Sequence, residues 1–163
     1  MSILKFENRT PRNLQEMYDY VTDRTKTSPQ WVFGLGVNPM NAVDEMKLVQ
    51  YIYGRHHLKH EYKQIIFCFD VGIRLEEAVI MEICVKIGNI LMMGNKRQIL
   101  GTIHGIGSEK VHCHYLINYV GIDGKLLKQD YSIIYYKDRV NEILLSYGLN
   151  PIYYYGSEQN EKK

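Results

Sequence analysis

Residues 112–118, His-Cys-His-Tyr-Leu-Ile-Asn, alternate in polarity, and this alternation constrains the fold more than any other feature of the chain. Side chains two apart on a β-strand share a face, so a strand here carries His112, His114, Leu116 and Asn118 on one side. The other side is more apolar and carries Cys113, Tyr115, Ile117 and Tyr119. Because such an apolar face suits packing against helices, the segment predicts a sheet with helical cover.

Periodicity along the rest of the chain predicts further strands and helices. Strands are expected at residues 3–6, 31–36, 62–69, 98–103 and 112–120, with a tight turn at residues 123–124. Helices are expected from Thr10 as N-cap with Pro11 at the first position, at 41–53, at 75–92 and at 132–147. The strands do not alternate one-for-one with long crossover helices. We therefore expect an α+β fold with a central, mostly antiparallel five-stranded sheet flanked by helices.

The length of 163 residues, 45% of them hydrophobic, fits one domain, expected at residues 1–155 with a flexible tail at 156–163. Its three cysteines, Cys68, Cys84 and Cys113, form no Cys-x-x-Cys pair and are interpreted as reduced core residues. No signal-peptide layout and no apolar run of ~20 residues is present, which predicts a cytoplasmic protein without membrane contact. The net charge of +2 alone does not indicate a nucleic-acid binder.

Three histidines have the spacing of a catalytic metal site. Alternate strand positions are about 6.5 Å apart, so His112 and His114 can both reach one ion at ~2.1 Å. His104 ends the preceding strand and faces this pair if the two strands form a hairpin through residues 105–111. Three imidazoles leave coordination positions open, as in catalytic rather than structural sites. A single histidine would more simply be a hydrogen-bonded surface residue, but the three together are interpreted as metal ligands.

Two tyrosines on the first helix have different expected environments. Tyr18 falls in the apolar stripe of Leu14, Met17 and Val21 and is expected to be buried. Tyr20 points about 120° away from that stripe and is expected to be available for chemistry. Helical geometry alone does not separate a reactive Tyr20 from an ordinary surface tyrosine.

Together these segments resemble the relaxases, the mobilisation nucleases of conjugative plasmids and integrative elements within the HUH (His-hydrophobic-His) endonuclease superfamily. The resemblance covers residues 13–151. Residues 20–23, Tyr-Val-Thr-Asp, with Lys26-Thr27 after them, are similar to the family segment whose tyrosine is the nucleophile. Residues 112–118 are similar to its His-x-His-x-x-x-Asn metal motif, and residues 64–72 and 147–149 also resemble family segments.

The chain departs from the family pattern at two places. The family has His-x-Asp before the metal motif, whereas this chain reads His104-Gly105-Ile106 with one extra loop residue. The aspartate that normally tunes the site is missing, and Glu109 is the expected substitute. A family serine of the third strand is Cys68 here, which weakens one expected DNA contact.

The resemblance implies a site- and strand-specific nuclease that nicks and rejoins DNA through a 5′-phosphotyrosine at Tyr20. His104, His112 and His114 would hold a divalent cation, Mg²⁺ or Mn²⁺ with Zn²⁺ as the alternative, and Glu109, Asp19 or Asp23 would accept the tyrosine proton. The implied partners are single-stranded DNA at an origin of transfer and auxiliary relaxosome DNA-binding proteins. A basic segment interleaved with tyrosines supplies most of the expected DNA contacts, which are Lys47, Arg55, Lys59, Lys63, Cys68 and Asn118.

Three other functions stay open at this point. A rolling-circle replication initiator or a small transposase would share the chemistry, although those relatives usually place the tyrosine after the histidine motif. A catalytically weakened HUH domain could act as a DNA-binding accessory, which the missing aspartate and Cys68 favour. A metallohydrolase unrelated to DNA could use the histidines to activate water, and Tyr20 would then be dispensable.

Overall fold

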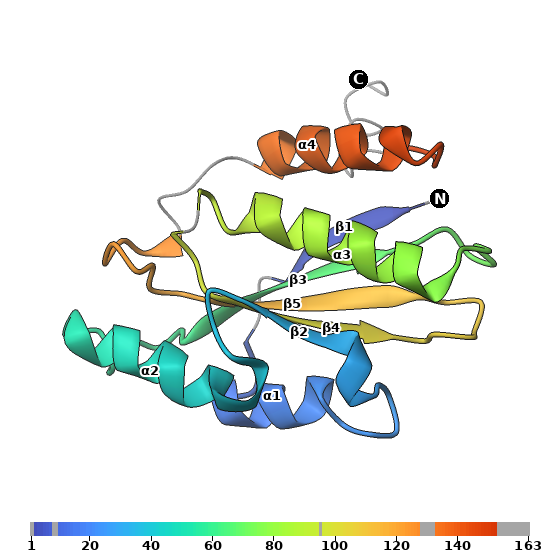
Figure 1. The fold of residues 1–163 in the computed structure, drawn as a ribbon. Coiled ribbons are helices and arrows are strands. Elements are labelled where there is room, and N and C mark those ends of the chain that lie inside the picture. The colour runs from blue at the N-terminus through green and yellow to red at the C-terminus, as the bar shows by residue number, and fades with distance from the viewer. Residues whose placement is uncertain (1, 8–9, 95, 128–132, 153–163) are drawn as a thin grey trace, which may run out of the picture.

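A five-stranded sheet forms the middle of the computed structural model, which describes residues 2–7, 10–94, 96–127 and 133–152 (Figure 1). The strands are β1 (Ile3–Glu7), β2 (Val32–Leu35), β3 (Tyr62–Cys68), β4 (Ile99–His104) and β5 (His112–Asn118). They lie in the order β1-β3-β5-β4-β2, and all four neighbouring pairs are antiparallel. The expected α+β class with an antiparallel five-stranded sheet is confirmed.

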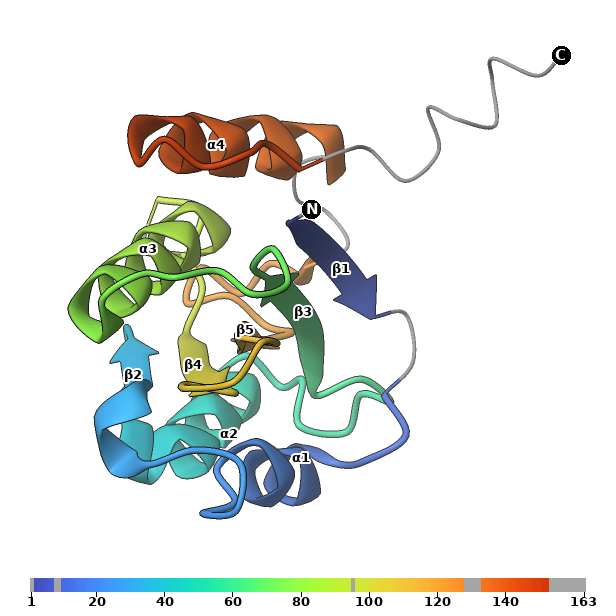
Figure 2. The ribbon, with the colours of Figure 1, turned by 90° about the vertical axis from the view of Figure 1, so that its right-hand side faces the viewer.

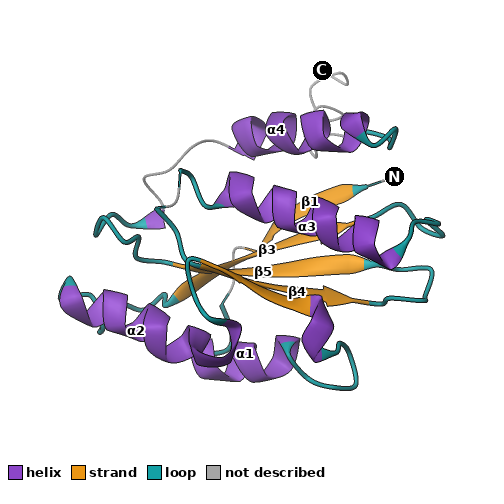
Figure 3. Ribbon diagram, viewed as in Figure 1, coloured by secondary structure: helices purple, strands orange, loops and turns teal. Residues whose placement is uncertain are grey.

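Helices cover both faces of this sheet (Figures 1 and 3). Helices α1 (Leu14–Val21) and α2 (Ala42–Ile52) lie on one face, and α3 (Glu77–Leu91) lies on the other. Helix α4 (Ile133–Ser146) lies outside α3, as the turned view also shows (Figure 2). Two short 3₁₀ turns, η1 (Pro29–Trp31) and η2 (Pro39–Asn41), flank β2. None of the described helices is both long and apolar enough to cross a membrane.

The alternation along β5 divides the core into two parts, of which only the one on the apolar face was expected. Cys113, Tyr115 and Ile117 are buried in the larger cluster beneath α3 and α4. Leu116 faces the opposite way, into a smaller cluster with Leu14, Met17 and Val21 of α1 and Met46 of α2. The central strand is therefore covered on both sides, and the α1–α2 face is the one that carries the histidines.

The structure corrects the expected start of the first helix. Helix α1 begins at Leu14, because the Asn13 side chain accepts a hydrogen bond from the Glu16 backbone N–H at 2.9 Å and acts as the N-cap. Thr10 instead pairs its hydroxyl with the ring of His60 at 3.1 Å, before the helix. The expected start of the last helix at Ser132 and the tail at 156–163 lie outside the described residues.

Candidate metal centre and nuclease site

The three predicted metal ligands converge at one end of the sheet. His104 and His112 are direct partners across the β4–β5 pair, and His114 follows two positions along β5 on the same face. One ring nitrogen from each histidine lies within 4.8 Å of the other two. Nitrogens that bind one ion at about 2.1 Å are at most about 4.2 Å apart, so a small rotation of the rings completes a three-imidazole site. The expected convergence is confirmed.

Each imidazole has a second partner that fixes its orientation. His104 Nε2 donates to the backbone carbonyl of Val21 at 2.7 Å, and His112 Nδ1 donates to that of Lys110 at 3.0 Å. A carbonyl only accepts, so Nδ1 of His104 and Nε2 of His112 keep their lone pairs. The side-chain amide nitrogen of Gln64 lies 2.7 Å from Nδ1 of His114; an amide turned by 180° would present its oxygen to Nδ1–H and leave the Nε2 lone pair of His114 for a metal. Such second partners are usual for metal-binding histidines.

Burial keeps two of these rings in the form that binds a metal. His104 and His114 are only 5% and 6% exposed. Burial lowers the pKa of His114 to about 3, with further lowering from the positive charge that His104, His112 and Lys26 can carry. Burial also lowers the pKa of His104, against the opposing effect of its bond to Val21. Both imidazoles are therefore neutral near pH 7, as ligation requires.

A glycine makes the hairpin loop between β4 and β5 compact despite its extra residue. Gly105 has φ +76°, and a Cβ atom there would lie 2.3 Å from the Lys110 carbonyl oxygen. The Ser108 hydroxyl donates to the Gly105 carbonyl at 2.7 Å and accepts from the Lys110 N–H at 3.1 Å. Since Lys110 also orients His112, the close approach at Gly105 is part of how the metal centre is built.

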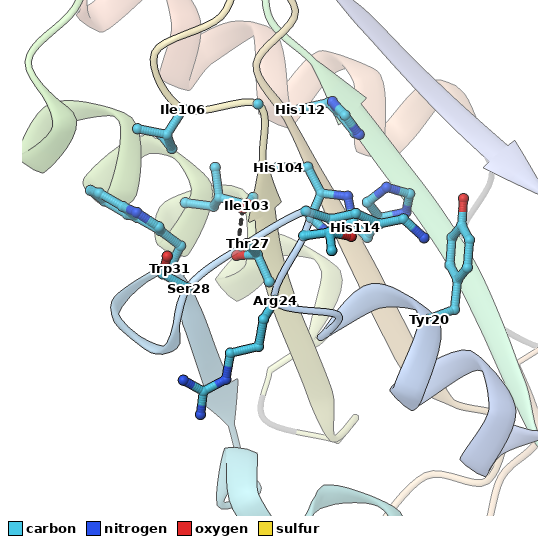
Figure 4. Close-up of a pocket in the computed structure, with 13 residues that line it drawn as sticks. Tyr20, Arg24, Thr27, Ser28, Trp31, Ile103, His104, Ile106, His112 and His114 are labelled. Atoms are coloured by element: carbon cyan, nitrogen blue, oxygen red, sulfur yellow. Dashed lines mark hydrogen bonds between the residues drawn. The ribbon is translucent and has the colours of Figure 1, made fainter.

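A cavity of about 650 Å³ brings the first helix to the histidines (Figure 4). Tyr20, the three histidines and the loop residues 24–28 line it together. The hydroxyl of Thr27 donates to the Ile103 carbonyl at 2.8 Å and ties this loop to the end of β4. Tyr18 lies outside this cavity lining and donates its hydroxyl to the Pro39 carbonyl at 3.0 Å. The structure thus places Tyr20, and not Tyr18, in the histidine cavity.

Two cations lie against the ring of Tyr20. The Lys26 ammonium nitrogen is 3.3 Å from the ring centroid, and the Arg12 guanidinium carbon is 4.3 Å from it. Lys26 is placed by its loop, where the Asp23 carbonyl accepts from the Lys26 and Thr27 N–H groups at 2.9 and 3.1 Å. The cavity therefore combines a phenol, the Lys26 cation and three converging imidazoles, which are groups able to bind a phosphate.

The nuclease-domain model of the relaxases of MobA/VirD2-like type matches residues 20–149, which is well over half of the chain. This chain belongs to that relaxase family. No curated protein matches it. The matched span begins at Tyr20 and includes all three histidines, so the family assignment and the geometry concern the same residues. The relaxase family is one of DNA nucleases, and the chain is accordingly a nuclease domain that acts on DNA.

The carboxylates expected to accept the Tyr20 proton do not line the histidine cavity. Glu109 lines a separate cavity of about 440 Å³ with residues 72–75, and its carbonyl accepts from the Gly72 N–H at 2.9 Å. Asp23 accepts from the N–H and hydroxyl of Thr25, and these bonds lower its pKa, which makes it a poor proton acceptor. Asp19 accepts from Gln15 at 3.0 Å. The described residues that line the histidine cavity include no carboxylate.

The residues expected to contact DNA do not form one surface. Arg55 and Lys59 lie in the loop before Tyr62, which is about 20 Å along β3 from Cys68 at the histidine end. Lys47 is exposed on α2. Lys63 alternates with Tyr62 and Gln64, so it belongs to the sheet face opposite the histidines. Cys68 is half-buried directly across from His112, and burial raises the pKa of its thiol.

Asn118 is buried, which contradicts the expected DNA contact. Its side chain is fully covered and bonds to Gln50 and Gln98, at 3.0 Å each, and to the Met46 carbonyl at 3.1 Å. These bonds join β5 to α2 and to the segment before β4. The last residue of the family motif is therefore structural in this relaxase.

Sequence reasoning missed three residues of the site. Arg12 precedes the helix, Gln64 reaches His114 from the neighbouring strand, and Arg24 sits in the loop. Lys26 was visible only through the resemblance of the Lys26-Thr27 pair, which assigned it no role. None of these contacts follows from a periodic pattern.

Proposed function

We propose that this relaxase nicks and rejoins one DNA strand at an origin of transfer through a covalent bond to Tyr20. The observation that carries the proposal is the shared cavity, which Tyr20 lines together with His104, His112 and His114. An accessible phenol beside a metal-type ligand set is the arrangement that nucleophilic attack on a phosphodiester needs.

In the proposed reaction the Tyr20 oxygen attacks the scissile phosphorus and the bond from phosphorus to the 3′ oxygen breaks. The phenol loses its proton and the leaving 3′ oxygen gains one, so the products are a 5′-phosphotyrosine and a 3′-hydroxyl. Lys26 lies where it can attract both the phosphate and the negative charge on the phenol oxygen. Because a phosphodiester replaces a phosphodiester, the free 3′-hydroxyl can reverse the step and rejoin the strand.

The three histidines would hold the divalent cation that polarises the phosphoryl oxygens when it is bound. Imidazole ligands suit Zn²⁺ well; Mn²⁺, although it also takes oxygen ligands, binds nitrogen sites as the weakest of the first-row divalent series, whereas Mg²⁺ binds almost only oxygen. Of the ions expected from the sequence, we therefore favour Mn²⁺ or Zn²⁺ over Mg²⁺. Recognition of the duplex origin is assigned to auxiliary relaxosome proteins, which the family resemblance implies.

The test is a denaturing gel of the protein incubated with labelled single-stranded DNA from the origin of its element, with Mn²⁺, with Zn²⁺ or with EDTA. A slow-migrating protein–DNA adduct is expected with metal, from wild type and from Tyr18→Phe. It should disappear in EDTA and in Tyr20→Phe, while Tyr20→Phe still binds metal. An adduct that persists in Tyr20→Phe would show that another residue is the nucleophile.

The missing carboxylate favours one alternative, a weakened domain that binds DNA as an accessory. That protein would bind the same oligonucleotide without forming an adduct under any metal condition. Nicking of supercoiled plasmid that carries the origin separates the two functions, because an accessory leaves the plasmid supercoiled.

A further inference from the structure

A second hollow, of about 660 Å³, adjoins the histidine cavity. Arg24, Thr27 and Ser28 line both of them, so the loop after α1 forms their common border. Figure 4 shows the Arg24 side chain extending from this loop away from the histidines. A chain that crosses the histidine cavity can therefore continue into the second hollow past Arg24.

The walls of this hollow are apolar and held in place. Pro29, Val32, Pro39 and Met40 provide the apolar surface, and Met40 is 86% exposed. The bond from the Tyr18 hydroxyl to the Pro39 carbonyl ties η2 to α1, and the Asn38 side-chain oxygen accepts from the Met40 N–H at 3.0 Å. The hollow is thus largely formed before any ligand binds.

Polar groups of the hollow remain available to a ligand. Within the described part of the chain, neither the Arg24 guanidinium nor the side-chain nitrogen (Nδ2) of Asn38 forms a hydrogen bond or an ion pair. No carboxylate occurs among the described residues of the lining. Apolar walls, one amide donor and a cation at the entrance suit a flat heterocycle joined to a phosphate.

We propose that this hollow binds the base of the nucleotide next to the scissile phosphate. Met40 and the prolines contact the base, Asn38 donates to its edge, and Arg24 binds the phosphate that links it to the histidine cavity. The inference rests on the proposed function, because it takes the scissile phosphate to lie at the histidines. The hollow would then contribute to recognition of the nick sequence.

The test compares two fluorescent probes, a random-sequence 12-nucleotide single strand and a 12-residue strand of abasic sites with the same phosphates. Binding is measured by anisotropy on metal-loaded protein in the Tyr20→Phe background, which cannot react. Met40→Ala should weaken binding of the ordinary strand about threefold to tenfold and leave the abasic strand unchanged. Arg24→Gln should weaken the binding of both strands equally. It should also lower by about one the number of counterions released on binding, as measured from the salt dependence of the affinity.

Leu145→Ala removes another exposed apolar side chain, far along the chain on α4, and should change neither affinity. Equal effects of Met40→Ala on the two strands, or no effect on either, would overturn the base-binding hollow. If the wild-type protein forms no adduct, the proposed function is wrong. The comparison of the two strands still decides whether the hollow binds a base. Failure of the protein to bind either strand would overturn both.

Discussion

The ammonium nitrogen of Lys26 lies 3.3 Å from the centroid of the Tyr20 ring, on the border of the cavity that contains the three histidines. The positive charge of Lys26 also contributes to lowering the pKa values of His104 and His114. One side chain therefore acts on the nucleophile and on the metal ligands together. The described lining of this cavity has no carboxylate, so no acidic side chain there offsets the charge of Lys26.

Replacing Lys26 by methionine should slow cleavage without weakening metal binding. We expect the single-turnover cleavage rate to fall about 10²-fold, because removing one group that stabilises transition-state charge typically has an effect of this size. The affinity for Mn²⁺ should stay equal or rise, since a cation that repels positive charge at the histidines is gone. Quenched-flow cleavage and calorimetric metal titration measure the two quantities.

Lys110→Met is the matched control, because Lys110 is an exposed lysine of the neighbouring hairpin loop whose carbonyl, and not its side chain, contacts His112. It should leave both quantities near wild type. A parallel loss of metal affinity in Lys26→Met would mean that the lysine only supports the local structure.

Gln64 should control how well His114 binds the metal. For Nε2 of His114 to offer a lone pair, Nδ1 must carry the proton and the amide of Gln64 must present its oxygen. Gln64→Glu supplies a stronger acceptor and should tighten Mn²⁺ binding about tenfold, whereas Gln64→Leu should weaken it about 10- to 100-fold. Calorimetric titrations decide this, with circular dichroism to verify folding. Identical affinities in the two variants would exclude a role for Gln64 in orienting the ring.

The sequence predicted those parts of the site that depend on a regular repeat. Alternation on β5 placed His112 and His114 on one face, and helical periodicity separated Tyr20 from Tyr18. The conformation of a loop and the register between two strands follow no such repeat, so the contacts that depend on them were not predicted. Lys26 reaches Tyr20 through a turn held by backbone bonds, and Gln64 meets His114 through the register of β3 on β5.

Three expected roles depended on information that a motif or a run of charges does not carry. Asn118 matches the motif, but the motif does not tell whether its amide faces DNA or the core. Lys63 belongs to a basic run, but its neighbours in β3 assign it to the other sheet face. Glu109 was expected to replace the aspartate, yet the compact turn at Gly105 leaves it in a different cavity.

Asn118→Ala should destabilise the fold without changing the chemistry. The substitution leaves the side chains of Gln50 and Gln98 without their buried partner, which costs about 2–4 kcal/mol in the free energy of unfolding. Urea unfolding measures that loss. The cleavage rate and DNA affinity of the folded fraction should match wild type, and a selective loss of DNA affinity would restore Asn118 as a DNA contact.

The metal-free protein should lose stability on mild acidification because of His114. Its folded pKa of about 3 is far below the ordinary histidine value of about 6.5, so below pH 6.5 the unfolded chain binds a proton that the folded chain does not. Stability is therefore full above pH 6.5 and falls as the pH drops from 6.5 toward 3. At pH 5 the loss from this residue is about 2 kcal/mol, and His104, whose pKa is also lowered, adds to it.

Urea unfolding at pH 7 and pH 5 in EDTA tests this prediction, with His114→Gln beside wild type. The variant cannot take up the proton in either state, so its free energy of unfolding should change less between the two pH values. His57→Gln, an exposed histidine beyond α2, should keep the wild-type dependence. If His114→Gln lost as much stability as wild type, protonation of the buried imidazole could not be the cause of acid sensitivity.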